Sequence, residues 1–428
     1  MRNLIVLIPM VVVGIIFWRY QKRNGTSFGP ISWIMAVYLV MTVLAVVLDV
    51  LGQAMAAYEL RVAPALYLSA CLAIAFWGLT SLTDRQVREI EIENIPIYRL
   101  FEIFLIVSSF ISIAFFFPFA RNALVGDIGS NRNDFEYFQG VLSAWGLLNT
   151  FSSLAANLFV FNLIFAFLNL APGFGSGKAS RVRAILLFGG STSEIFYVLA
   201  YVGRDGFVFW AATFILVYLL LRKFISDRSR RAVRKFAWIV LGLALVPFVA
   251  ITVSRFGSSD AGILLSVLQY GGVQVQQFND QFIGYSEPQW GRLNFPILFR
   301  LLPFDDPYFD RSEWFAVYTE LGVNPWTFST YIGSFVQDVG IWATPVLVGL
   351  IALGTRSSLR GVRLNGRLSL AQMFVFVLGA QIVLYGVFYF RQSMANSSVV
   401  AVLLIVLLFK VSGRLGKRRV LTSVPNSA

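Results

Sequence analysis

The sequence predicts an all-α membrane protein, a single bundle of about eleven transmembrane helices with one large loop on its outer side. Apolar residue types make up 57% of the 428 residues, and 41 residues are Phe. Charged types make up only 13%, about half the share found in soluble domains. So few charges cannot cover a water-exposed surface, which excludes a soluble enzyme. The apolar residues also gather in segments close to the roughly 20 residues that a membrane-spanning helix needs.

Eleven apolar segments are candidate spans. They are Leu4–Trp18, Ile31–Leu51, Pro64–Leu79, Leu100–Phe119, Val141–Leu170, Ala184–Tyr201, Gly206–Leu221, Phe236–Val253, Tyr331–Leu353, Leu368–Phe388 and Val399–Val411. The first is followed by Arg19 and Tyr20 and not by a small-residue cleavage site, so we expect a retained span. The long segment from Val141 to Leu170 is the place where a span is most easily missed or split.

The basic residues predict the orientation of the chain. Of the 35 Lys and Arg residues, 25 fall in one set of alternate loops, and all six Lys are among them. By the positive-inside rule this set is cytoplasmic, which places the N-terminus outside and the C-terminus inside. The net charge of +13 is therefore explained by topology, and we expect membrane lipids and no nucleic acid as partners.

Two residue types limit the chemistry. The chain has no His, and its one cysteine is Cys71. This excludes nucleophiles activated by His and an intramolecular disulfide. The sequence shows no metal-ligand cluster, and we expect no metal and no cofactor. Any reaction must use carboxylates, arginines, hydroxyls and the backbone.

The basic residues of the predicted outer side are all arginines, which allows two explanations. They are Arg2, Arg61, Arg121, Arg132, Arg204, Arg255, Arg292, Arg300, Arg311 and Arg391. The guanidinium fork binds a diphosphate or a carboxylate with two hydrogen bonds, which Lys cannot do. Alternatively, the bias follows by chance from a chain in which Arg greatly outnumbers Lys. The bias alone does not decide between them.

The largest predicted outer segment runs from Ser254 to Thr330, within the single membrane domain 1–428. A connection of this length is usually functional. It holds Trp290, Trp314 and Trp326. Its acidic residues are Asp260, Asp280, Glu287, Asp305, Asp306, Asp310, Glu313 and Glu320. Aromatic rings that stack on sugar C–H faces and carboxylates that accept from hydroxyls are typical of a glycan-binding cleft. An aromatic belt at the membrane interface explains the Trp residues equally well, but not the length of the loop.

Three shorter features lie at the same predicted face. A tight hairpin carries Arg204-Asp205-Gly206, and a short turn carries Arg391-Gln392. The third is Asp338, which follows the end of the long loop. If it lies within a span it is costly unless paired or hydrated, and thus a candidate site residue. If the span begins after it, Asp338 is an acid at a helix N-terminus.

One ionisable residue is predicted deeper in the membrane. Glu194 belongs to the sixth apolar segment, where a carboxylate serves an ion path or pairs with a neighbouring helix. The glycine-rich stretch from Gly173 to Lys178 lacks the spacing of a phosphate-binding loop, so we do not expect nucleotide binding there.

The layout resembles the O-antigen and capsule repeat-unit polymerases, the Wzy family. The resemblance is carried by Arg204-Asp205-Gly206, by Asn324-Pro325-Trp326-Thr327-Phe328 at the end of the long loop, and by Asp338-Val339-Gly340. Arg311 followed by Gly322 fits a further spacing of some members, and Val339 departs from the aromatic residue usual after the Asp. About thirty residues carry these motifs.

The resemblance implies a metal-independent inverting glycosyltransferase of the GT-C type in the bacterial inner membrane. It would join undecaprenyl-diphosphate-linked repeat units at the periplasmic face, with a chain-length regulator as a possible partner. Fixed arginines would stabilise the departing diphosphate. Asp338, the chosen base, and Arg204 are the catalytic candidates, with Glu287, Glu313 and Glu320 as competing bases. The substrate-binding candidates are Arg255, Arg292, Arg300, Arg311, Arg391, Glu287 and Tyr331.

Two other functions remain open. An O-antigen ligase would share the fold and the loop, but that family usually places a His in the loop, and this chain has none. A flippase of lipid-linked oligosaccharides would distribute its charged residues through an aqueous cavity.

Overall fold

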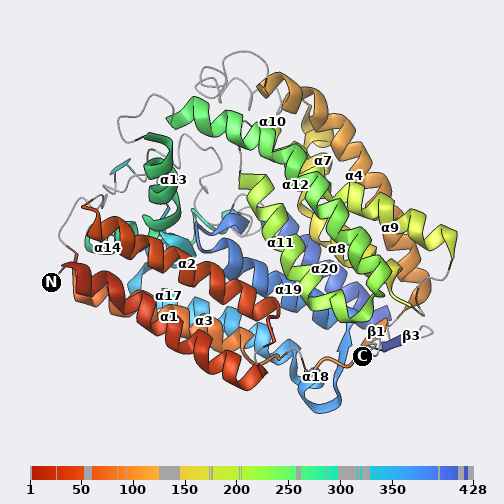
Figure 1. Cartoon of the computed structure of the whole chain (residues 1–428), viewed down its shortest axis with the longest axis horizontal. Helices are drawn as coiled ribbons and strands as arrows, with labels where there is room; N and C mark the ends of the chain where they lie inside the picture. The colour runs from red at the N-terminus through yellow and green to blue at the C-terminus, as the bar shows by residue number, and fades with distance from the viewer. Residues whose placement is uncertain are drawn as a thin grey trace. The chain divides into compact units, whose positions relative to one another are not determined.

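The structure is a computed structural model of the whole chain, and it is mostly helical (Figure 1). It describes residues 2–428 except for 53–59, 125–144, 257–261, 297–327 (of which 316, 319 and 320 are described), 394–395, 413–418 and 423–428, and the single residues 26, 84, 93, 173, 175, 176, 202, 204 and 286. The chain divides into two compact units. Unit 1 comprises Met1–Gln86, Leu264–Asn365 and Val375–Ala401, and unit 2 comprises Val87–Ile263, Gly366–Phe374 and Val402–Ala428. Hydropathy alone carries no signal of this division.

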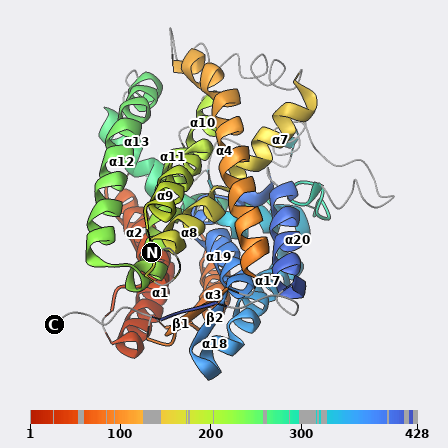
Figure 2. The same ribbon diagram turned by 90° about the vertical axis from the view of Figure 1, so that its right-hand side faces the viewer.

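Unit 1 begins with three long apolar helices that pack on one another. They are α1 (Arg2–Asn24), α2 (Pro30–Val50) and α3 (Val62–Leu79), and Figures 1 and 2 both show them side by side. Pro30 starts α2 because its fixed φ suits the first helical position, where no N–H is needed.

The remaining elements of unit 1 come from later in the chain. They are α13 (Gly262–Gly272), α14 (Gln274–Ile283), α17 (Thr330–Ser358), α18 (Arg360–Asn365) and the short 3₁₀ helix η2 (Arg391–Ser393). Two further helices, α19 (Leu370–Tyr385) and α20 (Asn396–Ser412), contribute residues to both units.

Helix α17 packs closely on α3 and is broken near its start. A Cβ on Gly78 of α3 would lie 2.6 Å from Ala352 Cα, so this contact of two backbones requires glycine. Gly340 has φ 86° and ψ 167°, which interrupts the helical path after Asp338. The break separates a first segment, which is buried almost throughout, from a longer apolar segment.

Unit 2 is a second group of helices, in which one predicted span is bent and another is interrupted at Thr192. Its members are α4 (Ile95–Leu124), α7 (Gly146–Asn157), α8 (Phe159–Leu170), α9 (Lys178–Ser191), α10 (Ser193–Ala200), α11 (Asp205–Leu221), η1 (Arg222–Phe224) and α12 (Asp227–Phe256). Helices α7 and α8 meet at 47°. This bend divides the predicted span from Val141 to Leu170, where a split was foreseen.

A buried carboxylate ties three helices of unit 2 together. Glu102 of α4 is fully buried, and its Oε2 lies 2.6 Å from Arg99 Nη1 and 3.4 Å from Arg183 Nε of α9. The side-chain amide of Asn169, from α8, donates to Glu102 Oε1. With two cationic partners and an amide donor, this carboxylate is well compensated for its burial.

A small sheet, which the hydropathy pattern did not predict, also belongs to unit 2. Strand β1 (Glu89–Ile92) lies between β2 (Arg367–Ser369), its parallel partner, and β3 (Arg419–Thr422), which runs antiparallel. The three strands come from distant parts of the chain and have only three or four residues each. Such short strands, far apart in sequence, leave no periodic signal.

The helices support a multi-pass membrane protein. Among the described residues, eight helices are long and apolar enough to cross a membrane, and nine if the bent pair α7–α8 forms one span. Each coincides with a predicted segment. The last two predicted spans correspond to shorter apolar helices, Leu370–Tyr385 and Val399–Val411, so the count of eleven stays a prediction, as does the GT-C fold.

Candidate functional site

Two of the predicted features, Asp338 and the turn at Arg391, belong to one cluster of unit 1. The cluster joins the start of α17 to the turn that follows α19. Thr330 N donates to Phe388 O at 3.0 Å, and Tyr331 N donates to Gly386 O at 2.9 Å. Phe390 N donates to Ser334 Oγ at 3.4 Å. The end of the long loop and the Arg391 turn, some sixty residues apart in sequence, are thereby held side by side.

The carboxylate of Asp338 binds the backbone of a turn in the long loop. Its Oδ1 accepts from the N–H groups of Gly291 and Leu293, each at 3.1 Å, and its Oδ2 accepts from Asn294 N at 2.9 Å. Asp338 is fully buried. Three backbone donors converge on one buried carboxylate, and these N–H groups offset the cost of burying its charge.

Helix α17 begins at Thr330, so Asp338 lies inside the helix. Gly340 breaks this helix two residues later, so which side of the break the membrane span begins on stays a prediction. Asp338 is compensated by the loop that precedes the helix, and this loop turn was not foreseen as its partner. Backbone N–H groups are common to nearly all residues, so the sequence does not indicate which of them bind Asp338.

A second hydrogen bond fixes the same turn to α17. Asn294 Nδ2 donates to Ser334 O at 2.9 Å, one helical turn before Asp338. Phe295 packs on Phe335 and Phe390, with ring centroids 6.1 and 5.6 Å apart. The loop turn, the helix and the Arg391 turn thus share one small core.

Arg391 is the buried cation of this cluster. The residue is 9% exposed, and its Cζ lies 5.7 Å from the centre of the Tyr385 ring. Burial lowers the pKa of the Arg391 guanidinium from its ordinary value to about 9. Because desolvation disfavours the cation here, an anion bound beside it would be stabilised strongly.

Tyr331, a predicted substrate-binding residue, lies next to this cluster. It is 1% exposed, and its hydroxyl oxygen has no hydrogen-bond partner among the described residues. Its ring packs edge-on against Phe335, with centroids 5.5 Å apart. An unsatisfied buried hydroxyl is costly unless water or a ligand completes it.

Helix α14 is a polar element that sequence reasoning missed. All eight residues from Gln274 to Gln281 are buried, and six of them are polar. Gln337 Nε2 of α17 donates to Gln281 O at 3.0 Å, and Asn279 holds both the N–H and the C=O of Arg61. Gln281 Oε1 has no partner among the described residues. The run of Gln and Asn residues between apolar segments was the available signal.

The other candidates of the loop lie at its surface. Glu287 is exposed, and Arg292 is partly exposed, within the turn that binds Asp338. Trp290 is 75% exposed. Glu320, a competing base, is also exposed.

Several candidates are not placed. Arg204, Arg300, Arg311, Glu313 and the motif from Asn324 to Thr327 lie outside the described residues. Arg255 belongs to α12, but its side chain is not among those described. The roles predicted for these residues therefore stay predictions.

Two glycines of the predicted Arg204 hairpin, Gly203 and Gly206, lie close against Val198 of α10. A Cβ on Gly203 would lie 2.6 Å from Val198 Cγ1, and a Cβ on Gly206 would lie 2.5 Å from Val198 Cβ. Both positions require glycine because the chain folds back directly onto α10.

A buried polar region lies beside the helix breaks of unit 2. Asn162 of α8 is fully buried, and neither atom of its amide has a hydrogen-bond partner among the described residues. A Cβ on Gly190 of α9 would lie 3.6 Å from Asn162 Oδ1. Helix α9 ends at Ser191, and buried Glu194 lies in the first turn of α10.

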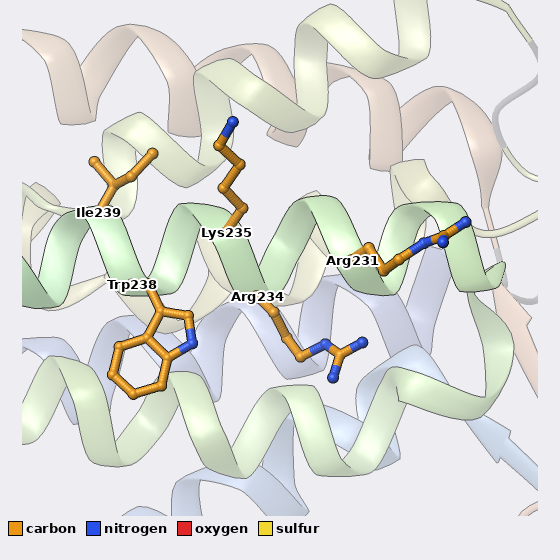
Figure 3. A pocket seen from close by; sticks show the side chains of 5 residues that line it. All are labelled: Arg231, Arg234, Lys235, Trp238 and Ile239. Atoms are coloured by element: carbon orange, nitrogen blue, oxygen red, sulfur yellow. The ribbon is translucent and has the colours of Figure 1, made fainter.

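A basic hollow lies on the surface of α12. Figure 3 shows its five lining residues on this one helix, with Lys235 and Ile239 on one side and Arg234 and Trp238 on the other. Because the side chains diverge from a single helix, the hollow has no opposing wall. Basic residues beside an exposed Trp are typical of a helix end at the membrane surface.

The described residues contain no group of three or more His, Cys, Asp or Glu side chains placed to hold a metal ion. Comparison of the chain with protein-family models, with curated proteins and with solved structures gives no match.

Proposed function

We propose that the protein is a glycosyltransferase that polymerises undecaprenyl-diphosphate-linked repeat units, as the Wzy resemblance implies. The observation that carries the proposal is the cluster in unit 1. It joins a buried arginine, Arg391, to the end of the long loop and to Asp338. Lipid diphosphates and glycans are the substrates for which a buried guanidinium and an aromatic-rich loop are suited.

In this proposal Arg391 binds a diphosphate. A buried guanidinium donates two parallel hydrogen bonds to phosphate oxygens, and low local polarity strengthens them. Such fixed donors stabilise the charge of a departing diphosphate in the way a metal ion does in other transferases. Arg292 and Arg300 of the long loop, which belong to the same unit, are expected to complete the site.

Asp338 has two roles in the proposal. As a carboxylate it accepts the proton of the acceptor hydroxyl, the role that the resemblance implies. As the partner of three backbone N–H groups it holds the turn from Gly291 to Asn294. The second role uses the same oxygen atoms, so a reacting hydroxyl must approach where these donors leave room.

The test is reconstitution of the purified protein with a lipid-linked repeat unit, with and without EDTA. A polymer ladder that persists in EDTA supports the proposal. Arg391→Lys, which keeps the charge but removes the planar fork, should shorten the ladder. A wild-type protein that forms no ladder under conditions where it is folded contradicts the proposal.

Transport of a lipid-linked glycan is the second candidate, and one observation favours it. Buried polar groups at broken helices are typical of transporter sites, and Asn162, Gly190 and Glu194 lie beside such breaks in unit 2. Transbilayer movement of the lipid-linked repeat unit in the same vesicles, without a ladder, would select this function instead.

A further inference from the structure

Trp290 has a backbone conformation that a bulky residue rarely adopts. Its φ is 54°, in the left-handed region, and Gly291 follows with φ 96°. Glycine adopts such angles without strain, but a tryptophan does not. Strained residues of this kind persist only where the surroundings hold them, and they occur preferentially at functional sites.

The buried carboxylate of Asp338 is what holds this backbone. It binds the N–H groups of the residues immediately after Trp290, at Gly291, Leu293 and Asn294. These three residues are buried. By contrast, Trp290, which precedes them, is exposed, and Arg292, which lies between Gly291 and Leu293, is partly exposed. The turn therefore places its bonding N–H groups inward and the Trp290 indole outward, with Arg292 partly exposed beside it.

The indole so presented is 75% exposed. An aromatic belt residue at a membrane surface needs neither a strained backbone nor a buried charge to hold it. Here the strained backbone and the buried carboxylate together keep the Trp290 ring out of the core, where burial would stabilise it. The exposure is thus imposed by the turn.

We propose that Trp290 is a stacking platform for a sugar ring of the glycan, with Arg292 beside it and Asp338 as the positioning residue of the turn. The glycan as ligand rests on the proposed function. The flat apolar face of the indole fits the C–H face of a pyranose, and the neighbouring guanidinium donates to hydroxyl or carboxylate oxygens of the same sugar.

The test uses the full chain in nanodiscs, labelled with 5-fluorotryptophan and observed by ¹⁹F NMR. The Trp290 resonance is assigned by its loss in Trp290→Phe. The probe is the soluble oligosaccharide released by mild acid from the lipid-linked repeat units of the native host. Trp342 of α17, 91% exposed, is the internal control. We expect the oligosaccharide to shift the Trp290 resonance and to leave that of Trp342 unchanged.

Kinetics supply a second readout. Trp290→Ala should raise KM for the lipid-linked repeat unit about five- to tenfold with little change in kcat, whereas Trp290→Phe, which keeps an aromatic face, should retain most of the affinity. Trp342→Ala is the matched control and should change neither constant.

The outcomes separate this inference from the proposed function. A polymer ladder from the wild type without any Trp290 shift, and with an unchanged KM in Trp290→Ala, overturns the platform and leaves the polymerase standing. A Trp290 shift from a protein that forms no ladder supports the platform and refutes the polymerase.

Discussion

Replacement of Asp338 by Asn tests the central contact of the candidate site. The carboxylate offers two oxygens to three N–H groups, with Oδ1 accepting from Gly291 and Leu293 and Oδ2 from Asn294. An asparagine has one oxygen and one NH₂ group. In either orientation at least one backbone N–H of the turn then faces a donor.

The magnitude follows from the burial of these groups. If the amide oxygen takes the place of Oδ1, the N–H of Asn294 is left buried without an acceptor, which costs about 1–3 kcal/mol. The other two hydrogen bonds lose their charged partner and weaken. Part of the cost is offset because the neutral amide is easier to bury than a carboxylate. We expect Asp338→Asn to lower the free energy of unfolding by about 1–3 kcal/mol.

The assay is thermal unfolding of the purified protein in detergent, combined with limited proteolysis of the long loop. The control is Glu287→Gln, which removes the same charge from an exposed position of the same loop. An exposed substitution should change stability by less than about 0.5 kcal/mol. If both variants unfold like the wild type and the loop is no more accessible to protease, the carboxylate does not hold the turn.

Three further predictions concern other parts of the chain. Binding of a lipid diphosphate analogue should weaken as the pH rises through about 9, since the Arg391 cation is lost there. Arg391→Gln should bind the analogue about 2–5 kcal/mol more weakly and without this pH dependence. Both are measured by isothermal titration calorimetry. Glu102→Ala removes an acceptor of the buried Asn169 amide and the anionic partner of two partly exposed arginines, and should lower the unfolding free energy by about 1–3 kcal/mol in thermal melts. In a Cys71→Ser background, an impermeant maleimide should label Ser258→Cys and spare Ser229→Cys in intact spheroplasts; the reverse pattern would invert the predicted topology.

Local sequence patterns foresaw the helices well because burial in a membrane imposes a long apolar run on each of them. Every helix or bent pair that is long and apolar enough to span coincides with a predicted segment. The suspected split between Val141 and Leu170 appears as the bend between α7 and α8. The sheet was not predicted because β1 and β2 pair across more than 250 residues of chain, and because such short strands show no periodic pattern.

The sequence predicted Asp338 and Arg391 as site residues, but it did not predict the contacts that bring them into one cluster. The cost of an ionisable group near a span indicated Asp338, whereas the binding chemistry of arginine indicated Arg391. Their common cluster depends on Ser334, Asn294 and backbone donors of the loop. A backbone N–H or C=O is present whatever the side chain, so hydrogen bonds to backbone atoms cannot be predicted from a sequence pattern.

Because Asp338 holds the turn, a loss of activity in Asp338→Asn alone does not identify a general base. Gly291→Ala separates the two roles. Its φ of 96° is unfavourable for alanine, so the substitution disturbs the turn while leaving the carboxylate in place. The two roles then predict different kinetics.

If Asp338 acts only through the turn, both variants should raise KM by similar factors and leave kcat nearly unchanged, since both misplace the groups beside Trp290. If Asp338 is also the base, Asp338→Asn alone should lower kcat by about a hundredfold or more, and Gly291→Ala should keep kcat. The comparison is made with polymerisation rates over a range of lipid-linked substrate. Equal, large losses of kcat in both variants would refute the base, because the carboxylate is intact in one of them and a base would retain its effect there.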